Sequence, residues 1–68
     1  MTRRIIFSRH ARQRMVLRGV SAHEVNEAIR KWTKRSQGGM LVATYLYFEV
    51  VFVVRGETVF VITVQPRW

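Results

Sequence analysis

Eighteen consecutive residues beginning at Ser8, S-R-H-A-R-Q-R-M-V-L-R-G-V-S-A-H-E-V, predict two helices and the turn between them. Ser8 is a favourable helix N-cap, and Gly19 suits the position just past a helix end, where a left-handed backbone costs least for a residue without a Cβ. These two signals predict a helix over residues 9–18. Ser21 and Glu24 have the spacing of a capping box, in which a hydroxyl and a carboxylate each accept a backbone N–H, so a second helix starts there.

The two predicted helices differ in how much apolar surface they offer a core. At about 100° per residue, the apolar positions of the second helix fall within roughly a 120° arc, which gives it one buried side. The first helix has only Ala11 and Met15 directed toward the core. We expect the second helix to end near Lys34, before a loop over residues 36–39, and His23 to lie on its solvated side. The positions expected to be buried are Ala22, Val25, Ala28, Ile29 and Trp32.

The apolar pattern changes from helical to extended after this loop. β-branched and aromatic residues predominate there, and the short connections between the resulting strands predict an antiparallel meander. The predicted strands cover residues 3–7, 40–48, 50–54 and 58–64. The expected fold is a single α+β domain over residues 1–68, in the order β-α-α-β-β-β, with two helices packed on a mainly antiparallel four-stranded sheet.

Length and composition exclude several classes of protein. A chain of 68 residues buries only about 60% of the surface that its unfolded form exposes, so we expect it to gain stability from a partner. It has no cysteine, which excludes disulfides and thiolate metal sites and suits a reducing cytoplasm. The longest apolar run, Val50–Val54, is far shorter than the roughly 20 residues that span a bilayer, and residues 1–7 lack the pattern of a signal peptide. We therefore expect a cytoplasmic protein without a membrane partner.

Positive charge is concentrated in the first half of the chain. Residues 1–19 hold six arginines and no acid, residues 20–37 hold four basic and two acidic side chains, and residues 38–68 hold two of each, so the net +8 is the sum of +6, +2 and 0. Such asymmetry is typical of a surface that faces a polyanion, and RNA is the first candidate. The alternative is that the charge serves only to keep a small protein in solution.

Candidate functional side chains lie mainly on the first predicted helix. The candidate RNA-binding residues are Arg9, Arg12, Arg14 and Arg18. His10 and Arg14 share one side of the helix, where an imidazole for proton transfer would stand beside a guanidinium for phosphate, as RNA cleavage by a 2′-hydroxyl requires. They are therefore the candidate catalytic residues. Further groups that could supply these roles are Tyr45, Tyr47, Arg55 and Arg67.

One other interpretation of these side chains stays open. His10 and Arg14 can instead be structural, tying the first helix to neighbouring backbone carbonyls. We expect no metal and no cofactor, because the chain has no aspartate, only two histidines and no glycine-rich nucleotide loop.

The strands over residues 50–54 and 59–64 are apolar on both faces, although a sheet covered by helices on one side should alternate apolar and polar residues. A homodimer or a small protein partner would cover the second face. The alternative is that the helices and chain ends wrap the sheet themselves.

The motif S-x-H-A-x-x-R-M-x-x-R-G-[IV]-S-x-x-E-V, which runs from Ser8 to Val25, resembles the small prokaryotic proteins grouped as domain-of-unknown-function family 4258, and residues 61–64 resemble that family's last strand. The family's β-α-α-β-β-β order of elements is similar to that of the RelE, ParE and BrnT toxins. The ribonuclease members of these toxins act on messenger RNA and are silenced by an antitoxin segment laid across the sheet and helices. The resemblance therefore implies a RelE-like fold, RNA as a candidate target and an antitoxin-like partner.

Two functions from different classes follow. The first is a RelE-like, toxin-related protein that binds RNA and is a candidate metal-independent endoribonuclease. The second is a non-enzymatic homodimer or partner-binding module that uses the apolar strand face.

Overall fold

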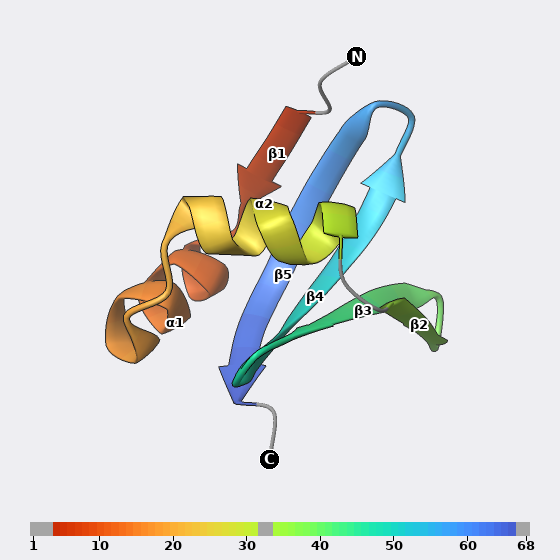
Figure 1. Ribbon diagram of the computed structural model, residues 1–68. Coiled ribbons are helices and arrows are strands. Elements are labelled where there is room, and N and C mark those ends of the chain that lie inside the picture. The colour runs from red at the N-terminus through yellow and green to blue at the C-terminus, as the bar shows by residue number, and fades with distance from the viewer. Residues whose placement is uncertain (1–3, 32–33, 67–68) are drawn as a thin grey trace.

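The computed structural model describes residues 4–31 and 34–66 (Figure 1). Two helices follow the first strand, and four strands follow the helices, so the order is β-α-α-β-β-β-β. The elements are β1 (Arg4–Phe7), α1 (Arg9–Arg18), α2 (Ala22–Lys31), β2 (Lys34–Gln37), β3 (Met40–Tyr45), β4 (Phe48–Arg55) and β5 (Thr58–Pro66).

The strands form one sheet in the order β1-β5-β4-β3-β2. β1 runs parallel to β5, and the other three pairs are antiparallel. Figure 1 shows α2 crossing in front of the sheet and α1 beside β5, beyond the end of β1. The predicted α+β class and the helices on a mainly antiparallel sheet are confirmed, but the sheet has five strands and not four. No helix of the described residues is long and apolar enough to cross a membrane.

The additional strand is β2, which the sequence predicted as the end of a helix and a loop. α2 ends at Lys31 instead, and the polar segment Lys34–Gln37 pairs with β3 from Lys34↔Ala43 to Gln37↔Met40. Gly38 and Gly39 connect the two strands with φ values of 57° and 82°. A two-residue turn with both residues left-handed matches the twist of paired strands, and this pairing overrides the weak strand propensity of K-R-S-Q.

The predicted boundaries of α1 are confirmed. The Ser8 hydroxyl accepts the N–H of Ala11 at 2.9 Å, and Gly19 adopts a left-handed conformation with φ of 68°. The N–H of Gly19 donates to the carbonyl of Val16, and that of Val20 to the carbonyl of Met15 at 2.9 Å. This is a Schellman motif, and it directs the buried Val20 into the core.

α2 begins with the predicted capping box. Glu24 accepts the N–H of Ser21 at 2.9 Å, while the Ser21 hydroxyl accepts that of Glu24 at 3.1 Å. His23 is exposed as expected, but Ala22 is exposed rather than buried, because the first turn of the helix extends beyond the core. The buried positions are Val25, Ala28 and Ile29, and Trp32 lies outside the described residues.

A β-bulge in β5 determines which of its residues reach the core. Val51 of β4 pairs with Thr63 and Phe52 pairs with Val61, so Ile62 is an extra residue between the two pairs. The alternation of faces therefore shifts by one residue, and Val64 returns to the side of Val61. The bulge explains why this strand has apolar residues at positions that a regular strand would direct to opposite faces.

Ser8 also joins α1 to this bulge. Its N–H donates to the carbonyl of Val61 at 3.0 Å, and its hydroxyl donates to the carbonyl of Ile62 at 2.8 Å. β1 stops pairing with β5 at Phe7, and the next residue makes both contacts. One serine thus ends the parallel strand pair and begins the helix that packs beside the rest of β5.

We predict that Ser8→Ala lowers the free energy of unfolding by about 1–2 kcal/mol, because it removes the N-cap and the bond to the bulge together. For a domain of this size, each kcal/mol corresponds to roughly 4–8 °C in Tm. Urea and thermal unfolding measure the change. Ser36→Ala, at an exposed position of β2, is the control and should stay within about 0.5 kcal/mol. Equal effects of the two substitutions would contradict this role of Ser8.

Candidate functional site

α1 contacts the core along a narrow line and leaves most of its surface to solvent. Ala11 and Met15 are its buried residues, as the sequence predicted. Three of the four candidate arginines, Arg9, Arg12 and Arg18, are exposed, and Arg14 is half-buried. None of the four forms an ion pair with another described residue. α1 therefore presents positive charge that no described acid neutralises.

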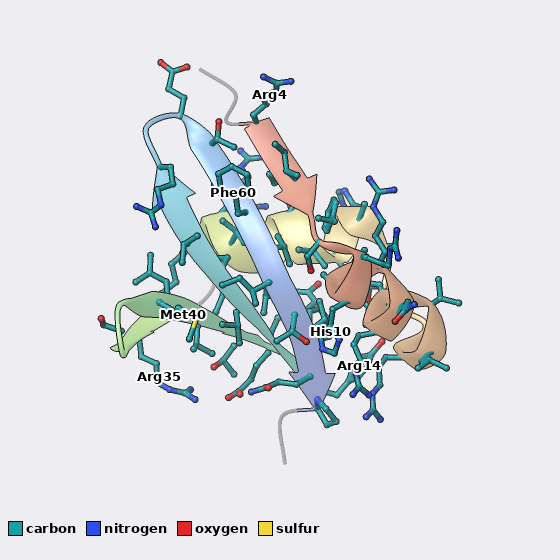
Figure 2. All side chains as sticks on the ribbon, turned by 180° about the vertical axis from the view of Figure 1, so that it is seen from behind. Arg4, His10, Arg14, Arg35, Met40 and Phe60 are labelled. Carbon is teal, nitrogen blue, oxygen red and sulfur yellow. The ribbon has the colours of Figure 1, made fainter. Side chains whose placement is uncertain are left out.

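His10 and Arg14 lie side by side on α1, next to the C-terminal half of β5 (Figure 2). They are four residues apart, which places them one above the other on the same side of a helix. His10 is exposed, and neither side chain makes a hydrogen bond or an ion pair with another described residue. The structure therefore brings the two candidate catalytic groups together.

The other described groups considered for proton transfer belong to the strands and to the turn between β3 and β4. Tyr45 is half-buried, with its ring 5.2 Å from that of Phe48, and Tyr47 packs edge-on to the same phenylalanine at 5.5 Å. Arg55 pairs with Thr58 at the start of β5, whereas His10 lies beside its other end (Figure 2). Arg67 lies outside the described residues. Of these groups, Arg55 is the one that the register separates from His10 and Arg14.

The sheet face opposite the helices, here called the open face, carries a polar network that sequence analysis missed. The Glu49 carboxylate of β4 accepts one hydrogen bond from the Arg35 guanidinium of β2 at 3.2 Å and another from the Gln65 amide of β5 at 3.1 Å. The Glu49 side chain is only 12% exposed, while that of Arg35 is 53% exposed. Alternation along β4 could have placed Glu49 on this face, but Arg35 could be placed only once β2 was known to be a strand.

The two halves of the open face differ in exposure. Val42 and Val51 lie opposite each other on β3 and β4 and are buried although no helix covers them. The register places Arg35 of β2 and Thr63 of β5 on either side of this pair, in the same row across the sheet. In the other half, Ile6, Phe60 and Ile62 of β1 and β5 are 36–40% exposed.

Val16 and Leu17 form a second exposed apolar pair, near the C-terminal end of α1, at 82% and 74% exposure. The structure gives neither of them a role in the core.

The arrangement defines a RelE-like α+β fold. Comparison with solved structures finds similarity to a chain of the toxin–antitoxin complex RelBE2 from Mycobacterium tuberculosis, with a TM-score of 0.67 and 15% sequence identity, covering 98% of this chain and 100% of that chain. No protein-family model and no curated protein matches the sequence. The likeness extends over the whole fold and is one of structure, since so few residues are identical.

We predict that Arg35 and Glu49 are coupled by about 0.5–1 kcal/mol in a double-mutant cycle, because the arginine is half exposed and solvent screens the pair. Alanine variants, singly and together, would be unfolded in urea at low salt, and the coupling should decrease at high salt.

The pair Glu27–Lys31 has the same 3.2 Å separation and provides the matched control. Its coupling should be smaller, at about 0.3 kcal/mol, since it joins neighbouring turns of one exposed helix. If the Arg35–Glu49 coupling is no larger than this, the network does not hold β2 to the sheet.

Proposed function

We propose that this protein is a toxin-related, RNA-binding protein of the cytoplasm and a candidate metal-independent endoribonuclease. The single observation that carries the proposal is the arginine-rich surface of α1, which no described acid neutralises, beside the paired side chains of His10 and Arg14. The RelE-like fold agrees with it. A fold does not define a function by itself, so the proposal depends on these side chains.

Binding would rest on contacts from guanidinium groups to phosphates. Arg9, Arg12 and Arg18 are exposed and can reach a polyanion without first breaking an ion pair to a described residue. Each phosphate that they neutralise releases condensed counterions, and this release would supply most of the binding free energy. Such binding would not depend strongly on sequence.

Cleavage would need one further step at the same place. The 2′-hydroxyl of a ribose attacks the adjacent phosphorus, its proton passes to a base, and the leaving 5′-oxygen gains a proton. His10 is the candidate for proton transfer, and Arg14 would stabilise the charge that develops on the phosphate oxygens. The products would carry 2′,3′-cyclic phosphate and 5′-hydroxyl ends, and no metal would be required.

A partner-binding function remains the second candidate, favoured by the exposure of Ile6, Phe60 and Ile62 on the open face. In that case a second copy or an antitoxin-like protein would cover this half of the sheet, and His10 would have no catalytic role. The neighbouring structure is a toxin–antitoxin complex, which agrees with an antitoxin-like partner.

We predict that RNA affinity falls steeply with salt. Four arginine–phosphate contacts on a single strand correspond to a slope of about −3 in log K against log salt, at roughly 0.7 per phosphate. Arg9→Gln and Arg12→Gln should each reduce the slope by about 0.7, as measured by fluorescence anisotropy. Arg30→Gln, which removes an exposed arginine from α2, is the control and should leave the slope unchanged. Affinity that does not change between low and moderate salt would refute RNA binding through α1.

We predict that the wild-type protein cleaves a mixed-sequence RNA in EDTA and that His10→Ala reduces the rate by about 10²–10⁴-fold, the usual contribution of general acid–base catalysis. Mass analysis should find 2′,3′-cyclic phosphate ends. His23→Ala removes the other histidine, which is exposed on α2, and should retain full activity.

Other outcomes separate the two candidate functions. No cleavage by the wild type at protein excess would exclude the enzyme and leave a binding protein. If His10→Ala lowers Tm while RNA binding is intact, the imidazole is structural.

A further inference from the structure

Phe60 places an aromatic ring on the open face, toward the N-terminal end of β5 (Figure 2). It is 38% exposed, and its ring contacts no other aromatic ring of the described residues. The register places Ile6 of β1 and Val53 of β4 on either side of it, in the same row across three strands. An exposed ring in an apolar row is a surface that a flat ligand can cover.

Two arginines belong to the next row on the same face. Arg4 and Arg55 flank Thr58, two residues before Phe60 on β5. Strand geometry puts this row about 6.6 Å from Phe60 along the strands, with the two arginine backbones roughly 10 Å apart. Neither side chain forms an ion pair with a described residue. We call Arg4, Ile6, Arg55 and Phe60 the Phe60 patch.

We propose that the Phe60 patch binds single-stranded RNA, with an unpaired base stacked on the Phe60 ring and Arg4 and Arg55 contacting the adjacent phosphates. The inference rests on the proposed RNA-binding function and specifies the RNA as unpaired. An aromatic ring beside positive side chains is the arrangement by which single strands are held without regard to sequence. In a duplex the bases are stacked on one another, so no base face would be available to Phe60.

The exposed area fits a base better than it fits a second copy of the chain. Ile6, Phe60 and Ile62 are 36–40% exposed, which offers roughly 230 Å² if each side chain has at most about 200 Å². A standard interface needs about 800 Å² per partner, of which about 450 Å² is apolar. Two copies would also bring Arg4 and Arg55 of one chain toward those of the other, although each chain carries a net charge of +8. Charge and area therefore both favour an anionic ligand of small contact area.

The Phe60 patch and α1 lie along one strand. Figure 2, which views the open face, shows Phe60 toward one end of β5 and His10 and Arg14 beside the other. A single-stranded RNA that runs along β5 would contact both the Phe60 patch and α1. The patch would therefore determine how an unpaired RNA segment is aligned relative to α1.

The test measures binding of a fluorescein-labelled 2′-O-methyl RNA of about twelve nucleotides, within the site sizes of single-strand binders. This RNA lacks the attacking hydroxyl, so it reports binding without cleavage. A hairpin-free single strand and a duplex of the same length are compared. Phe60→Leu keeps an apolar side chain for folding and removes the ring, and Phe60→Tyr restores a ring.

We expect Phe60→Leu to weaken single-strand binding by about fivefold or more, the lower limit of base–aromatic stacking, and to leave duplex binding unchanged. Phe60→Tyr should bind the single strand within about twofold of the wild type, because its ring can stack in the same way.

Each contrary outcome is distinct. If Phe60→Leu binds the single-stranded RNA as tightly as the wild type does, the stacking proposal is overturned and RNA binding by α1 is left intact. No binding of either RNA by the wild type would refute the proposed function, and the inference with it. A dimer in sedimentation equilibrium that Ile6→Ser dissociates would show that a second copy covers the patch.

Discussion

The Ser8 hydroxyl joins α1 to β5 at one point, since it accepts the N–H of Ala11 and donates to the carbonyl of Ile62. The first bond sets where α1 begins, and the second ties that beginning to the bulge of β5. Because a helix repeats every 3.6 residues, its start decides which side chains face the sheet. Ala11 and Met15 reach the core, and His10 and Arg14 come to lie beside β5, for this reason. The candidate site thus depends on one cap.

The two faces of the sheet are stabilised by different means. On the helix side, apolar side chains of α1, α2 and four strands pack into one core. On the open face, Arg35 of the Arg35–Glu49–Gln65 network pairs with Val42, so the network lies beside two buried valines. Burial there does not need a third layer, because side chains from adjacent strands are close enough to cover one another. On β1 and β5, the large apolar side chains that stay exposed on this face are Ile6, Phe60 and Ile62.

Local signals predicted the helical half of the fold well. The N-cap, the Schellman glycine and the capping box all act within a few residues, so Ser8, Gly19 and Ser21 could be assigned from sequence alone. β2 could not, because its residues have no strand pattern of their own and become a strand only by pairing with β3. The bulge at Ile62 was missed for a related reason: it shifts the register between two strands, which single-strand alternation does not report.

The part of the candidate site that lies on one helix was predictable from the sequence, and the parts that combine several strands were not. The pairing of His10 with Arg14 follows from their spacing on one helix. The Glu49 network and the Phe60 patch each combine side chains from three strands, and their assembly depends on register. Arg55 was predicted as a candidate partner of His10. Arg55 pairs with the start of β5, however, whereas His10 of α1 lies beside the other end of that strand.

The four polar residues of β2 also protect the protein from its own copies. Without β2, the apolar strand β3, M-L-V-A-T-Y, would be the edge of the sheet, with unpaired backbone groups available to any other strand. Such an edge is a template for aggregation, and natural proteins blunt it with short strands and basic side chains. β2 has both properties, since it is four residues long and carries Lys34 and Arg35. The strand with the least intrinsic strand propensity is therefore the one that closes this edge of the sheet.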